Sequence, residues 1–445
     1  MNLGLSTDAS APYEARFGEV IGGQGSLGPD WLTAARKHAF DSFVAQGWPS
    51  KRQEDWRFTD VAPITESALL PLVGHASLDL ASFDESLVKL GGDSDHRLVF
   101  VDGHHEAQFG GGHMPPAGLQ VAPLAKVLDS DELRSNLGHH LQSRNAFVAL
   151  NTAFMSDGAF VHIPAGFQTE APVYVVYLAS TAGSTSFPRT VIVAGPNSRA
   201  TVVELYLGAG GRATLSNAAT EIILGADAQL AYHTVQQASE EGFHIGHVAV
   251  SQAAGSQLAA HSLSLDGRIV RNDIQIVLAG EGSACNLDGV YLASGKSHID
   301  NQTTIDHTKP RSTSRENYRG AVEGAGHAVF SGRIIVRPGA SKTDAQQTNR
   351  NLILSDGAQV NSKPQLEIFT SDVKCAHGAT TGRLDPDALF YLRARGIGKK
   401  DADRILIRAF LQQGLERITS APLRAELEAL LDRRIDKLVA ADARP

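Results

Sequence analysis

The chain is poor in cysteine and contains no long hydrophobic run. Its 445 residues include only two cysteines, Cys285 and Cys375. So few thiols exclude a disulfide framework and favour a reducing compartment. No apolar run approaches the roughly 18 to 20 residues that a membrane-spanning helix needs, so we expect no membrane association of that kind.

Clusters of basic residues are also missing. The chain has 40 Lys and Arg against 48 Asp and Glu, a formal net charge of −8, and no run of Lys or Arg. This balance argues against a nucleic-acid partner and against an anionic membrane surface. The opening MNLGLSTDASAPYEARFGE lacks the basic and apolar segments of a secretory signal. Together these absences predict a cytoplasmic protein.

Sequence motifs for nucleotide and ester chemistry are absent as well. No Gly-x-x-x-x-Gly-Lys-Ser/Thr occurs, and no Gly-x-Gly-x-x-Gly follows a strand and opens a helix. The Gly-x-Ser-x-Gly turn of a hydrolase is missing too. If ATP hydrolysis accompanies the function of this chain, a partner must carry it out.

The N-terminal part, residues 1–144, predicts a helix-led region. Pro29 and Asp30 mark the start of a helix, apolar residues follow at spacings of three and four, and Gly47 marks its end. A second helical pattern covers residues 123–141. This region also holds all three tryptophans of the chain.

Residues 145–384 change to short runs rich in Val, Ile, Thr and Tyr, with no convincing long helix. A weak repeat recurs at steps of 30, 28, 27, 43 and 32 residues: Ser198-Arg199-Ala200, Ala228-Gln229-Leu230, Ser256-Gln257-Leu258, Ser283-Ala284-Cys285, Gly326-His327-Ala328 and Ala358-Gln359-Val360. Short strands with elastic spacing favour a β-solenoid. A β-sandwich is the alternative, because it also contains short strands at such spacing.

Residues 385–445 return to helix. Asp385 and Pro386 supply an N-cap and a first-turn proline, Asp401 starts a second helix, and Pro422 starts an amphipathic third one. We therefore expect a three-helix C-terminal domain.

Between the strands and these helices lies the sequence Cys375-Ala376-His377. Residues two apart on a strand point the same way, so this element could present a sulfur and an imidazole nitrogen to one metal ion. Zinc and iron–sulfur centres usually take four ligands, so distant residues or another subunit would have to complete the site. The alternatives are a His377 satisfied by a backbone carbonyl and a Cys375 that packs as a small hydrophobe.

The other cysteine and histidines favour structural roles. Cys285 falls at a repeat step where an inward position suits a small apolar side chain, so we expect it to pack. His244 and His247 are three apart in a strand and should point to opposite faces. We expect surface positions for the pairs His104-His105 and His139-His140 and for a further set, His233, His244, His247 and His261.

Three segments together resemble the SufB/SufD family of iron–sulfur cluster assembly proteins. These are Glu54-Asp55-Trp56-Arg57-Phe58-Thr59, residues 371–382 around the Cys-Ala-His element, and residues 387–397. The resemblance covers essentially the whole chain. The form Cys-Ala-His-Gly-Ala-Thr-Thr-Gly is similar to the SufD branch, whereas the SufB branch carries additional cysteines.

The resemblance implies a mainly β fold, a right-handed parallel β-helix flanked by helical N- and C-terminal regions. It implies a non-catalytic subunit that pairs with SufB through the β-helices and docks the SufC ATPase on its C-terminal helices. His377, with Cys375, would donate ligands to a transient iron–sulfur cluster or iron shared with SufB. The docking turn for SufC would comprise Arg393, Arg395, Gly396 and Ile397. A homodimer and a flavin in the complex are left open.

Two alternative functions follow from other features. One is a SufB-like scaffold that accepts sulfur, against which the scarcity of cysteine argues. The other is a β-helix lyase or hydrolase acting on polysaccharide, with a charged groove formed by Asp266, Arg268, Arg271 and Asp273. Such enzymes are normally exported, and no export signal is evident.

Overall fold

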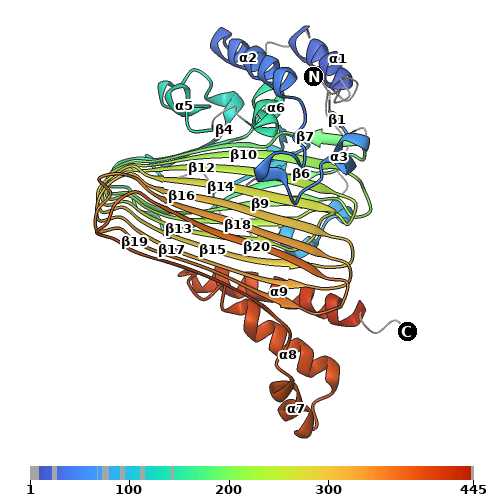
Figure 1. Ribbon diagram of the computed structural model, residues 1–445. Helices are drawn as coiled ribbons and strands as arrows, with labels where there is room; N and C mark the ends of the chain where they lie inside the picture. The colour runs from blue at the N-terminus through green and yellow to red at the C-terminus, as the bar shows by residue number, and fades with distance from the viewer. Residues whose placement is uncertain are drawn as a thin grey trace.

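The computed structural model describes residues 10–22, 28–67, 69–72, 80–90, 96–110, 116–141 and 145–441. Two long sheets of mainly parallel strands form a β-solenoid, with helices before and after it in the chain (Figure 1). This confirms the predicted solenoid and rules out the sandwich. Residue 144, the predicted end of the N-terminal region, lies outside the described residues, and the two boundaries between the three domains stay predictions.

Each coil contributes one strand to each sheet. Sheet A runs β20-β18-β16-β14-β12-β10-β8-β5-β4, and sheet B runs β21-β19-β17-β15-β13-β11-β9-β6-β2-β3. The strands of sheet A are β4 Gln120–Pro123, β5 Ala159–Ile163, β8 Arg189–Ala194, β10 Leu215–Leu224, β12 Phe243–Gln252, β14 Ile269–Leu278, β16 His298–His307, β18 His327–Val336 and β20 Gln359–Ile368, with β1 Leu70–Pro71 and β7 Ser184–Ser186 beside them. Those of sheet B are β2 Arg97–Val101, β3 His104–His105, β6 Val173–Ala179, β9 Arg199–Gly208, β11 Gln229–Gln237, β13 Gln257–Ser264, β15 Ala284–Ala293, β17 Thr313–Val322, β19 Asp344–Ile353 and β21 Lys374–Gly382.

This arrangement explains the uneven repeat. The first four triplets, at residues 198, 228, 256 and 283, lead into strands of sheet B. The last two, at residues 326 and 358, lead into strands of sheet A. The long step of 43 residues therefore marks a change from one sheet to the other.

Helices cover the first coils. They are α1 Ala11–Gly22, α2 Asp30–Gln46, α3 Ala62–Glu66, α4 Glu85–Val88, α5 Asp131–Asn136 and α6 Ala146–Phe154, with short 3-10 turns η1 Glu54–Trp56, η2 Leu80–Ser82, η3 Ala107–Phe109 and η4 Leu124–Lys126. The helix predicted from Asp30 is confirmed, and Gly47 ends it with φ of 66°. Its Phe40 and Phe43 pack with Tyr13 and Phe154 in an aromatic cluster.

Two helix predictions need correction. The pattern over residues 123–141 forms β4, η4 and the short α5 rather than one helix. Conversely, α6 lies in a region expected to hold strands only. Eight of its nine residues are buried, so it has no exposed polar face and lacks the periodicity that distinguishes a helix from a buried strand.

A buried carboxylate of sheet A, Glu221, holds the N-terminal region in place. Arg189 Nη2 lies 2.5 Å from Glu221 Oε1, and both side chains are fully buried. The same carboxylate accepts hydrogen bonds from the backbone N–H groups of Gly138, at 2.7 Å, and His140, at 2.9 Å. Because a buried carboxylate needs such partners, this contact fixes the segment after α5 on the solenoid.

Tyrosines and glycines interlock inside the lumen. Tyr291 on β15 packs over Gly320 of the next coil, and a methyl group added at Gly320 would lie 1.9 Å from the Tyr291 ring. Tyr318 covers Gly289 in the same way, with 2.1 Å to an added methyl. Glycine at these positions lets one coil receive the ring of its neighbour.

Replacing Gly320 by alanine is therefore expected to destabilise the chain by about 1–3 kcal/mol, since the ring and the backbone must shift to admit the methyl. Urea unfolding of Gly320→Ala would measure the loss. Gly378→Ala is the matched control, because Gly378 is also on a strand of sheet B but has nothing within 4 Å of an added methyl. Equal stability of the two variants would contradict the lumen packing.

The two ends of the solenoid differ. At the first coils, the antiparallel pairs β2 with β3 and β4 with β5 close the sheets. At the last coil, β20 pairs only with β18 and β21 only with β19 among the described strands. Two edge strands are thus left open at this end, and open edges invite pairing with another chain.

The C-terminal helices are α7 Pro386–Ala394, α8 Lys399–Gln412 and α9 Ala421–Ala441. As predicted, Asp385 caps α7, accepting a hydrogen bond from the Asp387 N–H at 2.9 Å. Leucines and isoleucines of α8 and α9 share a core cluster with the outer face of sheet B, while α7 projects away from the body (Figure 1). In the described part of the chain, we find no helix long and apolar enough to cross a bilayer.

Candidate functional site

The Cys-Ala-His element lies on β21, the last strand of sheet B. Cys375 is the register partner of Ala345, and His377 is the partner of Gln347. Ala345 and Gln347 are buried in the coil below and belong to rows of side chains that face the lumen. Cys375 and His377 therefore face the lumen side together, as the spacing of two predicts.

These two side chains are accessible only because the solenoid ends there. Cys375 is partly exposed and His377 is exposed, whereas the residues at the same positions one coil earlier are 0% and 1% exposed. Partial burial raises the pKa of the Cys375 thiol. The thiolate is the form that binds metal, so a cation or a basic neighbour from outside would favour ligation.

A buried polar pair lies beneath His377. Gln347 Nε2 donates a hydrogen bond of 2.6 Å to Glu316 Oε2, and both side chains are buried in the lumen. Burial raises the pKa of Glu316 to about 7. Gln347 Oε1 has no hydrogen-bond partner, which leaves one free acceptor in the layer directly below the exposed imidazole.

The rest of the open end is partly apolar. Val360 and Leu366 of β20 pack against the lumen core, and Ile368 and Phe369 are 41% and 56% exposed. A surface that combines exposed apolar side chains with unpaired strand edges is typical of an interface.

This site is incomplete by itself. Nowhere among the described residues do three or more His, Cys, Asp or Glu side chains converge to hold a metal ion. A thiol and an imidazole can supply at most two of the four ligands that an iron–sulfur centre usually takes.

The remaining cysteine and histidine predictions have mixed outcomes. Cys285 is 2% exposed in a lumen row, as expected for packing, and burial raises the pKa of its thiol. The surface prediction for the second histidine set is wrong, because all four side chains are buried: His233, His244, His247 and His261. Of the two adjacent pairs only His139 is exposed, while the others are partly buried: His104, His105 and His140.

Strand alternation and later packing explain the error. His244 points into the lumen against Tyr206, whereas His247 points outward, so the two do face opposite ways. His247 is covered by the N-terminal region, where Asn145 lies 2.8 Å from its Nε2. His261 is covered from the other side, where Arg417 pairs with the neighbouring Asp288.

The charged residues proposed for a polysaccharide groove do not line one surface. Asp266 pairs with Arg434 of α9 at 2.5 Å. Arg271 is fully buried on the opposite side of the solenoid, where it pairs with Asp300 and lies over the Trp56 ring at 4.0 Å. The prediction of a shared groove is therefore wrong, because the two sheets place these side chains on different faces.

The predicted docking turn closes the exposed helix α7. Gly396 has φ of 84° and donates to the Arg393 carbonyl at 3.0 Å, while the Ile397 N–H donates to Leu392. The guanidinium of Arg395 lies 4.9 Å from the Tyr391 ring.

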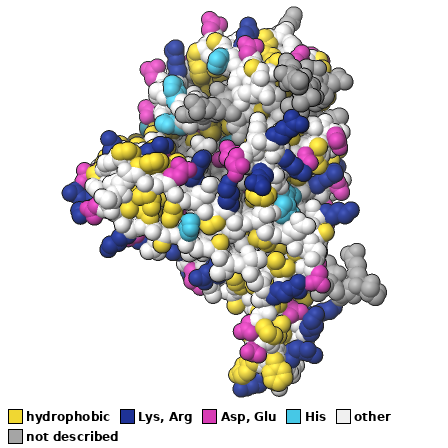
Figure 2. Space-filling view, in the orientation of Figure 1, with side chains coloured by type: hydrophobic (Ala, Val, Ile, Leu, Met, Phe, Trp, Pro, Cys, Tyr) yellow, Lys and Arg dark blue, Asp and Glu magenta, His cyan; other side chains and the backbone are white. Residues whose placement is uncertain are grey.

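The sequence did not lead us to expect exposed apolar side chains on this helix. Phe390 and Tyr391 are 74% and 58% exposed. Hydrophobic side chains are visible at the lower tip of the molecule in Figure 2, where Figure 1 places α7. The adjacent aromatics Phe390-Tyr391, next to basic residues, were the available signal.

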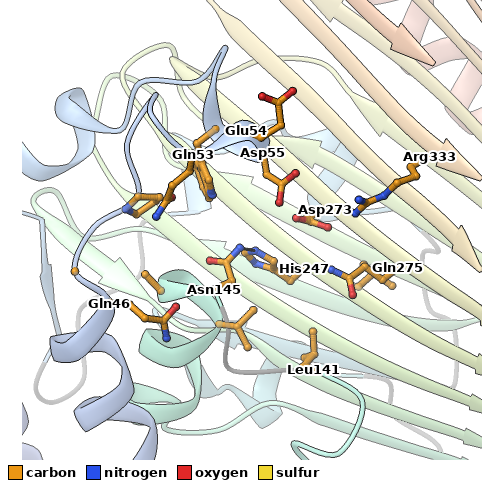
Figure 3. A pocket seen from close by; sticks show the side chains of 16 residues that line it. Gln46, Gln53, Glu54, Asp55, Leu141, Asn145, His247, Asp273, Gln275 and Arg333 are labelled. Atoms are coloured by element: carbon orange, nitrogen blue, oxygen red, sulfur yellow. Dashed lines mark hydrogen bonds between the residues drawn. The ribbon is translucent and has the colours of Figure 1, made fainter. Parts of the chain in front are cut away.

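A cavity of about 470 Å³ lies elsewhere, between the N-terminal region and the outer face of sheet A. In Figure 3, Asp55, Asp273 and Arg333 point toward one another across it, and His247 and Asn145 lie beside them. Burial raises the pKa of Asp273, and the nearby Asp55 carboxylate adds to this effect. None of the predicted ligands lines the cavity, so it is separate from the open end.

Comparison with known proteins places this geometry in a family. The model of the SUF system FeS cluster assembly SufBD core domain matches residues 177–410, which is more than half of the chain. The model of the SufBD protein N-terminal region matches residues 25–175. The chain belongs to the SufBD family.

Individual relatives agree with this assignment. A SufBD family protein of Synechocystis, named for iron–sulfur cluster assembly, is 30% identical over 408 residues, covering 89% of each chain. Proteins named SufD are 28% identical in Escherichia coli, covering 90% of this chain and 92% of the relative, and 29% identical in Bacillus subtilis, covering 98% and 100%. SufBD similarity thus extends over nearly the whole chain, including the open end.

Proposed function

We propose that the chain is a SufD-type subunit of a SufBCD complex that assembles iron–sulfur clusters. It pairs with SufB at the open end of the solenoid and contributes His377, with Cys375, to a transient cluster site between the two subunits. The observation that carries this proposal is the uncapped last coil, which exposes a thiol and an imidazole of the lumen rows.

The open end supports pairing with another β-helix. A partner of the same architecture can add its own edge strands to β20 and β21 and cover the apolar side chains between them. It would also bring the ligands that the described residues lack. A second copy of this chain is the other candidate for this surface.

The donor set suits a cluster that is to be passed on. Imidazole in place of thiolate makes the ligand shell less negative and the ligation less tight. Iron and sulfide are then cargo assembled at the interface rather than a resident cofactor. The role of the chain is ligand donation, without a catalytic turnover of its own.

The C-terminal helices are the proposed docking element for the SufC ATPase. The exposed Phe390 and Tyr391 beside Arg393 and Arg395 offer an apolar and basic surface on a helix that projects from the body. ATP binding and hydrolysis by SufC would then shift the relative positions of the two platforms. In this proposal the chain divides at residues 144 and 384 and acts in the cytoplasm.

Pairing can be tested with two alanines of β21. Ala379 belongs to the lumen row and Ala376 to the opposite face, and both are exposed. Ala379→Glu is expected to weaken co-purification with SufB at least about tenfold, because a charge must be buried in the interface. Ala376→Glu is the matched control and should co-purify normally. Equal retention of SufB by both variants would overturn the proposed pairing surface.

A further inference from the structure

Two histidines face each other on the outer side of sheet A, far along the chain from the Cys-Ala-His element. His298 begins β16, and His327 begins β18 at the register position directly beside it. Their Nδ1 atoms are 3.1 Å apart. Both side chains are partly buried, under the segment that follows η1.

A neighbouring amide fixes the tautomer of the neutral His327 ring. Its Nε2 lies 2.6 Å from Asn361 Oδ1, an amide oxygen that can only accept. Nε2 must therefore carry the proton. A neutral imidazole has one N–H, which leaves a lone pair on Nδ1 of His327.

The same holds for His298 through two linked contacts. Its Nε2 lies 2.8 Å from Thr59 Oγ1. The single hydroxyl proton of Thr59 is donated to Asp300 Oδ2 at 2.5 Å, so Thr59 Oγ1 can only accept from the histidine. Nε2 of His298 is then the N–H, and its Nδ1 also carries a lone pair.

Two lone pairs thus point into the same space, an arrangement that repels unless a cation lies between them. The ring centroids are 4.7 Å apart and the ring planes are inclined by 62°. In a straight N–H···N hydrogen bond, the two ring centroids and the two nitrogens lie on one line. With 3.1 Å between the nitrogens, the centroids would then be more than 4.7 Å apart. The lone pairs are therefore inclined to the line that joins the nitrogens, which favours a shared ion over a shared proton.

We propose that His298 and His327 bind a divalent transition-metal ion of the Zn²⁺, Co²⁺ or Ni²⁺ type through their Nδ1 atoms. Two nitrogens at zinc bond length in tetrahedral geometry are about 3.3 Å apart, so the observed separation needs to widen by only a few tenths of an ångström. Imidazole is a preferred ligand of these metals. Water completes the coordination, since the described residues offer no third side chain of the usual kind.

The surroundings match those of metal-binding histidines. Such residues usually donate their other ring N–H to a carboxylate, a carbonyl or an equivalent acceptor, as both do here through Thr59 and Asn361. Asp300, behind Thr59, also accepts from Gln302 Nε2 at 2.7 Å and from Arg271.

A metal ion at this place would connect the N-terminal region with the solenoid. Thr59 belongs to the Glu54–Thr59 segment, whose Trp56 is stacked by Arg271. The ion fixes both rings, and His298 in turn holds Thr59. The site is independent of the proposed cluster role, because the isolated chain holds every residue that forms it.

The test uses the isolated chain without a histidine tag, treated with a chelator and then titrated with Zn²⁺ by calorimetry. We expect about one equivalent to bind, and binding to raise the Tm because the ion favours the folded state. His298→Ala and His327→Ala should each weaken Zn²⁺ binding at least about tenfold. Co²⁺ should give visible absorption bands that both variants lose.

His38→Ala is the matched control, since it removes an exposed histidine that belongs to neither proposed site, and it should bind Zn²⁺ as the unaltered chain does. His377→Ala then reports whether Zn²⁺ binds at the open end instead. His327→Gln replaces His327→Ala if the alanine variant does not fold. The proposal is overturned if the unaltered chain binds no Zn²⁺ at millimolar concentration. It is equally overturned if the double variant of His298 and His327 binds normally, or if His377→Ala alone abolishes binding.

Discussion

Acidification from pH 7 to pH 5 is expected to lower the free energy of unfolding by on the order of 5 kcal/mol. The cause is a group of histidines that the fold keeps neutral. Burial lowers their pKa to about 3 or 4, and desolvation is the largest cause in each: His233, His244, His247, His261 and His307. In the unfolded chain the same rings take up protons near pH 6.5.

The sign of this effect follows from where the protons bind. The unfolded state binds more protons than the folded state between about pH 6.5 and pH 4, so stability falls as the pH decreases through this window. Two buried acids oppose it, because burial raises the pKa of Asp288 to about 6 and that of Glu316 to about 7. Those two groups stabilise the fold as the pH falls, but five histidines outweigh them.

Urea unfolding at pH 7, 6 and 5 in a buffer with chelator measures the effect. His244→Leu should reduce the pH dependence of the unfolding free energy by about one proton, because it removes one titrating ring. The substitution breaks no hydrogen bond at Nδ1, since this atom has no partner. His38→Ala, at an exposed position, is the control and should leave the dependence unchanged. A stability that is flat or rises toward pH 5 would contradict the burial of these rings.

The second large effect concerns His377. In the proposed complex with SufB and SufC, His377→Ala is expected to lower the iron and sulfide bound after assembly at least about tenfold, while the subunits still co-purify. The reason is that His377 is exposed, so its side chain is not part of the packed core. Its loss is expected to remove the proposed ligand without disturbing the coils below.

Two further variants are measured beside His377→Ala: Cys375→Ala as a comparison and Thr381→Ala as a control. Cys375 shares the lumen side with His377, so a smaller loss of iron is expected if its thiol also binds. Thr381 is exposed on the same strand and brings no sulfur or imidazole, so its replacement should leave the iron content unchanged. An iron content that falls equally in all three variants would indicate a disturbed strand rather than a lost ligand.

Residues with strong local preferences predicted correctly where two helices begin or end. Gly47 ended α2 and Asp385 capped α7, because caps and positive φ act on single residues. The alternation of strand residues placed Cys375 and His377 on one side. The solenoid could be predicted because its repeat follows the starts of its strands.

Long-range packing decided what the sequence could not show. The burial of His247 and His261 depends on segments far away in the chain, around Asn145 and Arg417, and the strand pattern shows only that they face outward. Arg271 looked like a groove residue, but the Glu54–Thr59 segment covers it. The first coil is capped and the last coil is open because of how the strands pair, which the sequence pattern of a single strand does not show.

The most direct measurement of the central claim is pulsed electron paramagnetic resonance of the reduced cluster on the assembled complex. With this chain alone labelled with ¹⁵N-histidine, the account predicts a nitrogen hyperfine coupling that responds to the label and disappears in His377→Ala. A cluster that shows no such coupling, or one that the His377→Ala variant leaves unchanged, would contradict it.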